Sequence, residues 1–272
     1  MPRNNPFRLL LLIPLLLLLL ASPLLAQWEP DVRLTNNPDS SFTPYNWCVA
    51  ATGDTVHVVW WDQRDGNNEI YTKRSVDGGA NWGTDTRLTY DLARSCYPSV
   101  AASGSNVNVV WLDRRDGNYE LYAKRSTDRG ATWGSDTRLT SNDSSTSRPS
   151  VAASGSDVHV VFYDYRNGNW EIYHKRSLDG GANWGTDMRL TNNSALSVLP
   201  TVAVSGSNVY LVWSDQRDGN YEIYYKRSTD GGVNWSSDLR FSPNDGAVSY
   251  LPSVAVSGSR VHVTWYDNRD GN

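Results

Sequence analysis

Cysteine, excess basic charge and long apolar runs are all scarce in this sequence. Two cysteines occur among 272 residues, and neither directly follows the apolar stretch at the start, so a lipid-anchored N-terminus is not expected. The formal net charge of −4 at pH 7 gives no electrostatic reason to bind nucleic acid, whose recognition depends on basic patches. No later stretch approaches the roughly 20 apolar residues of a membrane span. We therefore expect a mature chain that neither spans a membrane nor binds nucleic acid.

Residues 1–26 have the composition of an export signal. Arg3 and Arg8 supply a positive start, residues 9–20 form a short aliphatic stretch, and a site for signal cleavage follows. An uncleaved membrane anchor is the alternative, but the twelve residues of the apolar stretch are few for a span of about 20. We expect the signal to be removed and residues 27–272 to be secreted.

The motif Ser-x-Asp-x-Gly-x-x-Trp occurs four times at a spacing of 51 residues. Self-similarity at such a period indicates a repeat architecture with one supersecondary unit per copy. The motif residues are Ser75, Asp77, Gly79 and Trp82; Ser126, Asp128, Gly130 and Trp133; Ser177, Asp179, Gly181 and Trp184; and Ser228, Asp230, Gly232 and Trp235.

Each repeat contains four segments that are typical of β-strands and none with helical periodicity. In the second copy these are residues 99–103, 107–113, 120–126 and 133–140. Asp116-Gly117 between the second and third segments is a strong hairpin signal. The second segment is apolar on nearly both faces, and blades stacked around an axis would cover both. We predict an all-β propeller of four-stranded antiparallel blades.

The motif resembles the Asp-box, or bacterial neuraminidase repeat, of sialidase-like β-propellers. The resemblance covers nearly the whole mature chain at one box per blade, and it implies a six-bladed propeller. Kelch repeats have a similar period of about 50 residues but lack this turn, so they are the less favoured fold.

The residues of the box have a structural interpretation. In the turn between the third and fourth strands, the Asp carboxylate can accept hydrogen bonds from backbone N–H groups. The Gly permits a conformation closed to residues with a Cβ, and the Trp can bury about 200 Å² against its blade. We therefore interpret the boxes as structural elements.

The repeat pattern is cut at both ends of the sequence. Residues 28–35 match a fourth strand, as in residues 82–89, whereas residues 269–272 lie inside a hairpin. We interpret the chain as four full blades plus partial ones, from a longer protein in which further domains may follow. A distorted five-unit ring, or assembly with a partner chain, are the alternatives.

An Asp-x-Arg pair begins the hairpin between the second and third strands of each repeat. Strand parity places these hairpins on one face and the Asp-boxes on the other, so any ligand site is expected on the hairpin face. Arg can bind carboxylates bidentately, and two carboxyl groups about 5 Å apart suit a retaining glycosidase. The alternative, which repetition favours, is that the Asp, Arg and Glu side chains satisfy one another. The candidate residues are Asp62, Arg64, Asp113, Arg115, Asp164, Arg166, Asp215, Arg217, Asp267 and Arg269.

The resemblance implies three arginines on a sialic acid carboxylate, a Tyr nucleophile with its Glu, and an Asp acid/base. The Arg-Ile-Pro motif of such enzymes is absent; Arg148-Pro149 is the nearest match. We expect every arginine of the hairpins to have repeat counterparts, so no catalytic residue is assigned. The favoured function is a secreted, non-catalytic module that binds glycans or cell-surface proteins; the alternatives are an exo-α-sialidase or related glycosidase, and a spacer.

Cofactors and metals are not expected. His57, His159 and His262 share one strand position, where they suit packing better than metal binding, and the Asp-rich hairpins have Arg where a calcium loop needs oxygen. Cys48 and Cys96 begin the first strand in successive repeats, so either a disulfide or two free thiols is open.

Overall fold

The computed structural model describes residues 31–43 and 48–271, and the predicted signal peptide lies outside this part. A compact unit starts at Leu34. All regular elements in the described ranges are β-strands, and no helix there is long and apolar enough to cross a membrane. The strands are β1 (Ser41–Phe42), β2 (Val49–Thr52), β3 (Thr55–Asp62), β4 (Glu69–Ser75), β5 (Thr86–Arg87), β6 (Ser95–Ser103), β7 (Asn106–Asp113), β8 (Glu120–Ser126), β9 (Thr137–Arg138), β10 (Thr146–Ser154), β11 (Asp157–Asp164), β12 (Glu171–Ser177), β13 (Met188–Arg189), β14 (Ser197–Ser205), β15 (Asn208–Asp215), β16 (Glu222–Ser228), β17 (Leu239–Arg240), β18 (Ser249–Ser257) and β19 (Arg260–Asp267).

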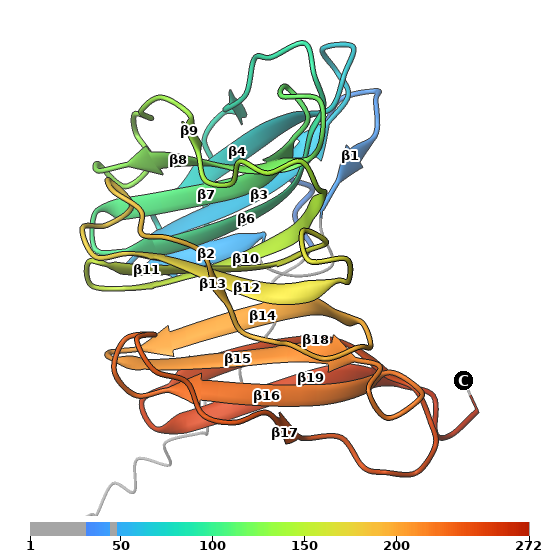
Figure 1. Cartoon of the computed structure of the whole chain (residues 1–272). Coiled ribbons are helices and arrows are strands. Elements are labelled where there is room, and N and C mark those ends of the chain that lie inside the picture. The colour runs from blue at the N-terminus through green and yellow to red at the C-terminus, as the bar shows by residue number, and fades with distance from the viewer. Residues whose placement is uncertain (1–30, 44–47, 272) are drawn as a thin grey trace, which may run out of the picture. The chain divides into compact units, whose positions relative to one another are not determined.

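These strands form successive antiparallel sheets, which we number as blades one to five (Figure 1). The second, third and fourth blades each join four strands in chain order, β6–β9, β10–β13 and β14–β17. In the first blade β1 and β2 both pair with β3, so together they take the place of one inner strand; the fifth blade joins β18 and β19. The predicted all-β architecture of four-stranded blades is confirmed. The outer strands are shorter than predicted, and the inner strands begin four residues earlier.

Packing between blades explains why the second strand is apolar on both faces. Val109 and Trp111 of β7 are buried against Val59 and Ile70 of the first blade. On the other face of β7, Val110 and its neighbours pack against the third blade. Each such side chain contributes about 1.5–3 kcal/mol when buried. The core is therefore a series of apolar layers between blades.

The inner strands of the second to fifth blades each contain a β-bulge with an unusual backbone conformation. The register shifts in β6, β10, β14 and β18, next to a residue with positive φ that precedes a proline. A left-handed non-glycine residue costs roughly 1–2 kcal/mol, and bulges of this kind re-aim a side chain. The four residues are Tyr97 (φ 52°), Arg148 (39°), Leu199 (55°) and Leu251 (53°). We call them the bulge residues.

Backbone hydrogen bonds define the two faces of the blades. Gly78 of the first box donates its N–H to the carbonyl of Asp54 in the loop between the first two strands, at 2.7 Å. At the other end, the Asn67 side chain donates to the carbonyls of Asp91 and Ala93, which joins the central hairpin to the loop that enters the next blade. We call these ends the box face and the hairpin face.

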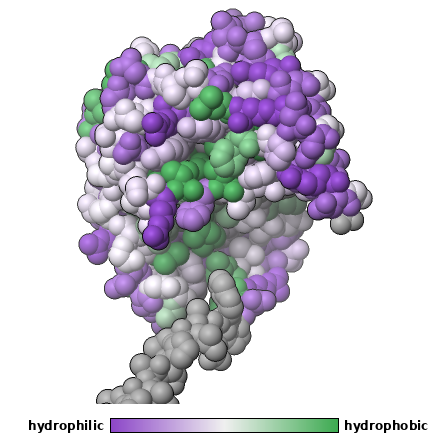
Figure 2. All heavy atoms as spheres, turned by 90° about the horizontal axis from the view of Figure 1, so that it is seen from below, coloured by the Kyte–Doolittle hydropathy of each residue, from purple (hydrophilic) through white to green (hydrophobic). Residues whose placement is uncertain are grey.

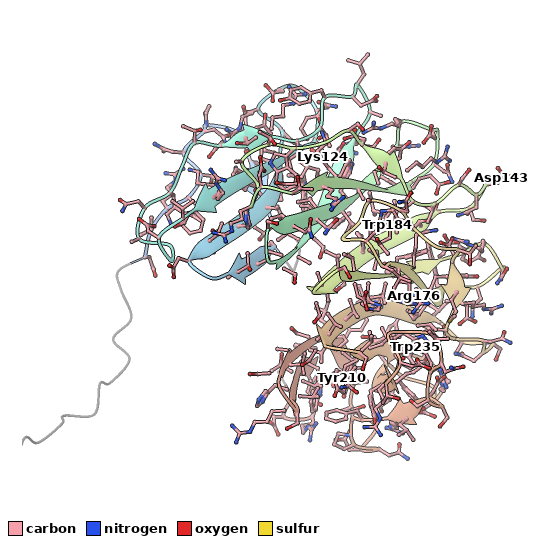
Figure 3. The ribbon with its side chains drawn as sticks, turned by 90° about the vertical axis from the view of Figure 1, so that its left-hand side faces the viewer. Lys124, Asp143, Arg176, Trp184, Tyr210 and Trp235 are labelled. Atoms are coloured by element: carbon pink, nitrogen blue, oxygen red, sulfur yellow. The ribbon has the colours of Figure 1, made fainter. Side chains whose placement is uncertain are left out.

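Lysines tie the second and fourth blades to the outer strand of the preceding blade, whereas Lys175 of the third blade donates to the carbonyl of Gly185 in its own blade. The ammonium group of Lys124 donates to the carbonyl of Leu88 at 2.5 Å, and Lys226 makes the same bond to Leu190 at 2.6 Å (Figure 3 shows Lys124). Lys73 of the first blade bonds in this way to the carbonyl of Leu34, at 2.5 Å. The segment at Leu34 thus has the contact of an outer strand, which its sequence match predicts.

Apolar side chains are exposed near the fifth blade. Phe241 is 49% exposed and Val261 is 38% exposed, and both line a groove of about 300 Å³ with Val254 and Val263. Figure 2 shows an apolar patch on the side of the molecule that is viewed from below Figure 1.

The two cysteines have free thiols in this structure. Cys48 packs on the apolar layer between the first and second blades, whereas Cys96 is buried in the layer between the second and third. The two side chains thus enter different layers and are not bonded to each other in this structure, and the choice between a disulfide and two free thiols stays a prediction.

Candidate functional site

The Asp-box turns on the box face are held by their own side chains. In the first box, Asn81 donates its backbone N–H to Asp77 Oδ1 at 2.8 Å, while Ser75 Oγ donates to the same carboxylate at 2.7 Å and accepts from the N–H of Gly79 at 2.8 Å. The second, third and fourth boxes repeat these bonds. The hydrogen bonds from Asn81 lower the pKa of Asp77 to about 2. The box aspartates therefore fix the turn.

The box tryptophans are half-buried on the same face. Trp133 packs on the layer between the first and second blades, and Trp184 and Trp235 on the following layers. Figure 3 shows Arg176 between Trp184 and Trp235, and its guanidinium donates to the carbonyl of Gly231 in the next box at 2.7 Å. Arg74 makes the same kind of bond to Arg129, so the second and fourth boxes are also joined to the preceding blade.

The Asp and Arg side chains of the hairpins are paired with each other. In the second blade, the Arg115 guanidinium binds both oxygens of Asp113, at 2.9 and 2.7 Å, and its remaining terminal nitrogen lies 2.8 Å from Asp136. Asp136 is also paired with Lys124 at 3.0 Å, and Asp113 accepts the indole N–H of Trp111 at 2.9 Å. Both charges of the hairpin pair are therefore satisfied within the blade.

The same network recurs around the other hairpins. In three of these networks one Arg binds two Asp: Asp62–Arg64–Asp85, Asp164–Arg166–Asp187 and Asp215–Arg217–Asp238. In the fifth blade Arg269 binds Asp267. Burial raises the pKa of Asp113, but hydrogen bonds from Arg115 and Trp111 outweigh burial and hold the pKa below its usual value. These candidate residues therefore build the hairpin and leave little of either charge for a ligand.

The Glu that follows each hairpin is also engaged. Glu69 is buried opposite Asp62 on the adjacent strand, where it accepts a short hydrogen bond from Thr89 and pairs with Arg87 at 2.9 Å. Burial raises the pKa of Glu69. Because Asp62 is held by Arg64, the two carboxyl groups are parts of separate networks rather than an open acid–nucleophile pair.

Three arginines on the hairpin face depart from the repeat. Arg114, in the hairpin of the second blade, stands where the other blades have Gln63, Tyr165, Gln216 and Asn268. The backbone N–H of Arg114 donates to the carbonyl of Arg94 at 3.1 Å. In the third, fourth and fifth blades the equivalent bonds run from Tyr165 to Ser145, from Gln216 to Leu196 and from Asn268 to Val248, so Arg94 is the second arginine without a counterpart. Arg148 is the third, since the other bulge residues are Tyr and Leu. The expectation that every hairpin arginine recurs is therefore wrong for Arg114.

Two of these arginines lie over tyrosines of the second blade. The Arg114 guanidinium carbon is 5.8 Å from the ring centroid of Tyr119, and that of Arg148 is 5.3 Å from the ring of Tyr97. Both tyrosines pack on the layer between the second and third blades. Among the described residues, neither Arg94 nor Arg114 has an ion-pair partner.

Aromatic rings continue this cluster into the first blade. Phe42 stacks on Trp61 with ring centroids 5.5 Å apart, and Trp61 lies 5.0 Å from Tyr97. With Arg148 over Tyr97, the row crosses three successive blades. We call Phe42, Trp61, Tyr97, Tyr119, Arg94, Arg114 and Arg148 the asymmetric cluster.

The repeat itself hid this cluster from sequence reasoning. The Asp-boxes and the Asp-x-Arg hairpins are positions that recur from repeat to repeat, whereas the cluster is formed by residues that differ from one blade to the next. The usable signal was the change of residue at one repeat position, such as the series Tyr97, Arg148, Leu199 and Leu251. Nowhere in the described ranges do three His, Cys, Asp or Glu side chains gather as they would around a metal ion.

Solved structures with a similar fold include several enzymes that act on glycans. No protein family and no curated protein matches this sequence. An α-L-arabinofuranosidase of Fusarium graminearum, in complex with arabinobiose, is 19% identical with a TM-score of 0.60, over 82% of this chain and 77% of that one. A Penicillium chrysogenum α-L-arabinanase has a TM-score of 0.58 at 14% identity, over 78% and 77% of the two chains.

A Hadza microbial sialidase gives a TM-score of 0.55 at 18% identity, over 81% of this chain and 49% of that one. At these identities the similarity shows the fold, which is that of sialidase-like propellers. Function has to be argued from the residues of the hairpin face.

Proposed function

We propose that this protein is a secreted, sialidase-like propeller that binds glycans through the asymmetric cluster and does not cleave them. The observation that carries the proposal is the contrast between repeated and non-repeated charges on the hairpin face. The repeated arginines are held by carboxylates of their own blade, whereas the guanidinium groups of Arg114 and Arg148 lie over tyrosine rings, and Arg94 is joined to Arg114 by a backbone hydrogen bond.

The chemistry of the cluster suits a carbohydrate. Aromatic rings such as Trp61 and Tyr97 offer flat apolar faces of the kind that cover the C–H faces of a sugar. Guanidinium groups donate paired hydrogen bonds to hydroxyls and above all to carboxylates. An acidic glycan is therefore the favoured ligand. The glycan-active enzymes with this fold add support from fold similarity alone.

The carboxylates of the hairpins support binding without cleavage. A glycosidase needs one carboxyl group that keeps its proton and a second that attacks or activates water. Asp113 is held ionised by Arg115, and Glu69 is buried with Thr89 and Arg87 as partners. Neither group is set to exchange a proton with a bound sugar.

The repeat supplies substitutions that test the proposal without disturbing the fold. Arg148→Leu copies the bulge residue of the fourth blade, Arg114→Gln copies the first blade, and Arg94→Ser copies the third. We expect the triple variant to keep its Tm and to lose binding to an array of acidic glycans by more than tenfold. Leu199→Ala, at the same bulge in the next blade, is the matched control and should bind as the parent does. Equal binding by parent and triple variant would refute the site.

A second candidate function is that of an exo-α-sialidase. The three non-repeated arginines favour it, because the sialidases that the Asp-boxes resemble bind the carboxylate of sialic acid with three arginines. Turnover of a fluorogenic sialoside by the full-length protein, lost in the triple variant, would replace the binding proposal with this one. Absence of any glycan binding would instead favour a spacer.

A further inference from the structure

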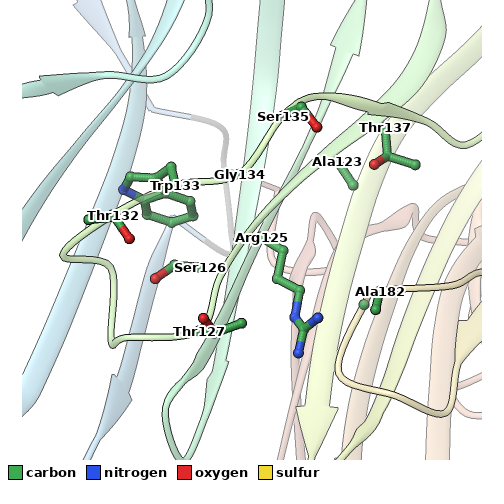
Figure 4. Close-up of a pocket in the computed structure, with 11 residues that line it drawn as sticks. Ala123, Arg125, Ser126, Thr127, Thr132, Trp133, Gly134, Ser135, Thr137 and Ala182 are labelled. Carbon is green, nitrogen blue, oxygen red and sulfur yellow. The ribbon is translucent and has the colours of Figure 1, made fainter.

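Three grooves lie on the box face, each beside a third strand and its own box turn, and the first two also reach the box turn of the next blade. They contain Arg74 with Trp82, Arg125 with Trp133, and Arg176 with Trp184. The middle one, which we call the Arg125 groove, has a volume of about 390 Å³ and reaches the next box at Ala182 (Figure 4). Ligand pockets usually measure about 300–1,000 Å³, so the groove has room for one small polar ligand.

The arginine of this groove differs from its counterparts. Arg74 and Arg176 each donate through Nη1 to a backbone carbonyl of the following box turn, at 3.1 and 2.7 Å. Arg125 instead donates through Nη2 to the side chain of Asn106 at 2.9 Å. Its Nε is buried and has no hydrogen-bond partner among the described residues. Arg74 and Arg176 thus use an N–H group of the guanidinium to join two blades, and Arg125 does not.

One further polar side chain beside Arg125 lacks partners within the described ranges. Asn108 is the cross-strand neighbour of Arg125, is 1% exposed, and has neither its amide nitrogen nor its oxygen hydrogen-bonded. It touches Gly181, which lines the groove. Buried polar groups are usually satisfied, so the adjacent exceptions at Arg125 and Asn108 suggest a missing ligand.

Arg125 is the charged side chain that lines its groove, and the nearby Asp128 carboxylate is engaged by the lining Thr132, whose hydroxyl donates to it at 2.6 Å. The carboxylates of Asp77 and Asp179 line the first and third grooves together with their arginines. No carboxylate lines the Arg125 groove, where the other polar side chains include those of Thr127, Ser135 and Thr137. A single guanidinium among hydroxyls suits a ligand that has one negative charge and several hydroxyl groups.

We propose that the Arg125 groove binds one acidic sugar residue, a uronate. Its carboxylate pairs with the guanidinium of Arg125, which can meet both oxygens at once. The ring lies beside Trp133, and the threonine and serine hydroxyls meet those of the sugar. The site is on the box face, so it is independent of the glycan site proposed for the hairpin face.

A titration followed by NMR tests this site with two probes that differ only at C6, the sodium salt of methyl β-D-glucuronide and methyl β-D-glucoside. Every protein carries Arg94→Ser, Arg114→Gln and Arg148→Leu, so that the site proposed for the hairpin face does not contribute, and this background chain is compared with its Arg125→Gln, Arg125→Lys and Arg176→Gln variants. We expect the glucuronide to bind the background chain and Arg176→Gln alike, and to bind Arg125→Gln at least tenfold more weakly. Arg125→Lys should lie between, because it keeps the charge but loses the planar fork.

Each other outcome overturns the proposal. Equal binding of the glucoside would remove the role of the carboxylate. Equal losses in Arg125→Gln and Arg176→Gln, or no loss in Arg125→Gln, would remove the role of this groove. Displacement of the glucuronide by sodium sulfate at the same concentration would show a site for simple anions rather than for a sugar.

Discussion

Nδ1 of His159 lies 3.0 Å from Nε2 of His174, and the two imidazoles are stacked within the third blade. One nitrogen must donate while the other accepts, so the pair is neutral. Burial lowers the pKa of His159 to about 4 and, with the nearby His159, that of His174 to about 3. The ring of Trp235 covers His174 from the next box, with centroids 5.3 Å apart.

This pair predicts an acid-sensitive fold at mild pH. A His side chain in the unfolded chain has a pKa of about 6.5, so above that pH neither the folded nor the unfolded state binds a proton at these two residues. Between pH 6.5 and about 4 only the unfolded state binds one. The free energy of unfolding therefore falls as the pH drops from 6.5 toward 4. Each buried His with a folded pKa near 4 contributes a loss of about 2 kcal/mol between pH 7 and pH 5. Urea denaturation should show a smaller pH-dependent loss for His174→Gln than for the parent. His262→Gln, at an exposed His, should keep the parental slope; an unchanged slope in His174→Gln would contradict the prediction.

Removal of a box carboxylate should destabilise the chain. Asp128 accepts the backbone N–H of Thr132 at 2.9 Å and its hydroxyl at 2.6 Å, so Asp128→Ala leaves the turn without its acceptor. We expect the Tm to fall by a few degrees in a thermal melt. Asp143→Ala, at an exposed loop residue (Figure 3), is the control and should melt with the parent. Equal Tm values for both variants would show that the box is dispensable.

The second box contains a strained residue that the other boxes avoid. Arg129 has φ +57°, at a position where the first box has Gly78. Because glycine adopts this conformation freely but loses more entropy on folding, Arg129→Gly should stabilise the chain by about 0.5–1 kcal/mol. The reverse test is Gly78→Ala, where a Cβ would meet nothing within 4 Å and only backbone strain acts. It should lose about 1 kcal/mol in urea denaturation; the same sign for both variants would refute strain as the cause.

The free thiols predict a difference in reactivity. Burial raises the pKa of Cys96 to about 12 and also raises that of Cys48, which is only half-buried. Alkylation of the native protein with iodoacetamide should label Cys48 slowly and leave Cys96 unlabelled, and both should react after unfolding without reductant. A labelling that requires prior reduction would instead demonstrate a disulfide.

The architecture was predictable because local and long-range signals agree in it. A strand such as β7 has apolar side chains on both faces and therefore has to be covered on both. The repeat of 51 residues predicts a similar blade on each side of it. The bulges were not predictable: a residue before proline is expected to be extended, and only packing in the inner strand holds Tyr97 or Arg148 at positive φ.

The candidate site likewise has a part that the sequence predicts and a part that it does not. The Asp–Arg pairs are short-range, and their mutual satisfaction could be weighed as an alternative from the hairpin sequence alone. The asymmetric cluster joins Trp61, Tyr97 and Arg148 from three blades, at separations of 36 and 51 residues along the sequence, so no local pattern contains it. The grooves of the box face differ in the acceptor that their arginine binds, which is a backbone carbonyl for Arg74 and Arg176 and the Asn106 side chain for Arg125. The sequence of the repeat does not indicate this difference.

The bulge residues separate folding from recognition. One backbone conformation accommodates Tyr97, Arg148, Leu199 and Leu251, so the chemistry of each side chain is free to change while the strand remains as it is. A library that varies only these positions would therefore sample new ligand preferences on an unaltered scaffold. Drift at the same positions would let related propellers acquire different ligands without passing through unstable intermediates.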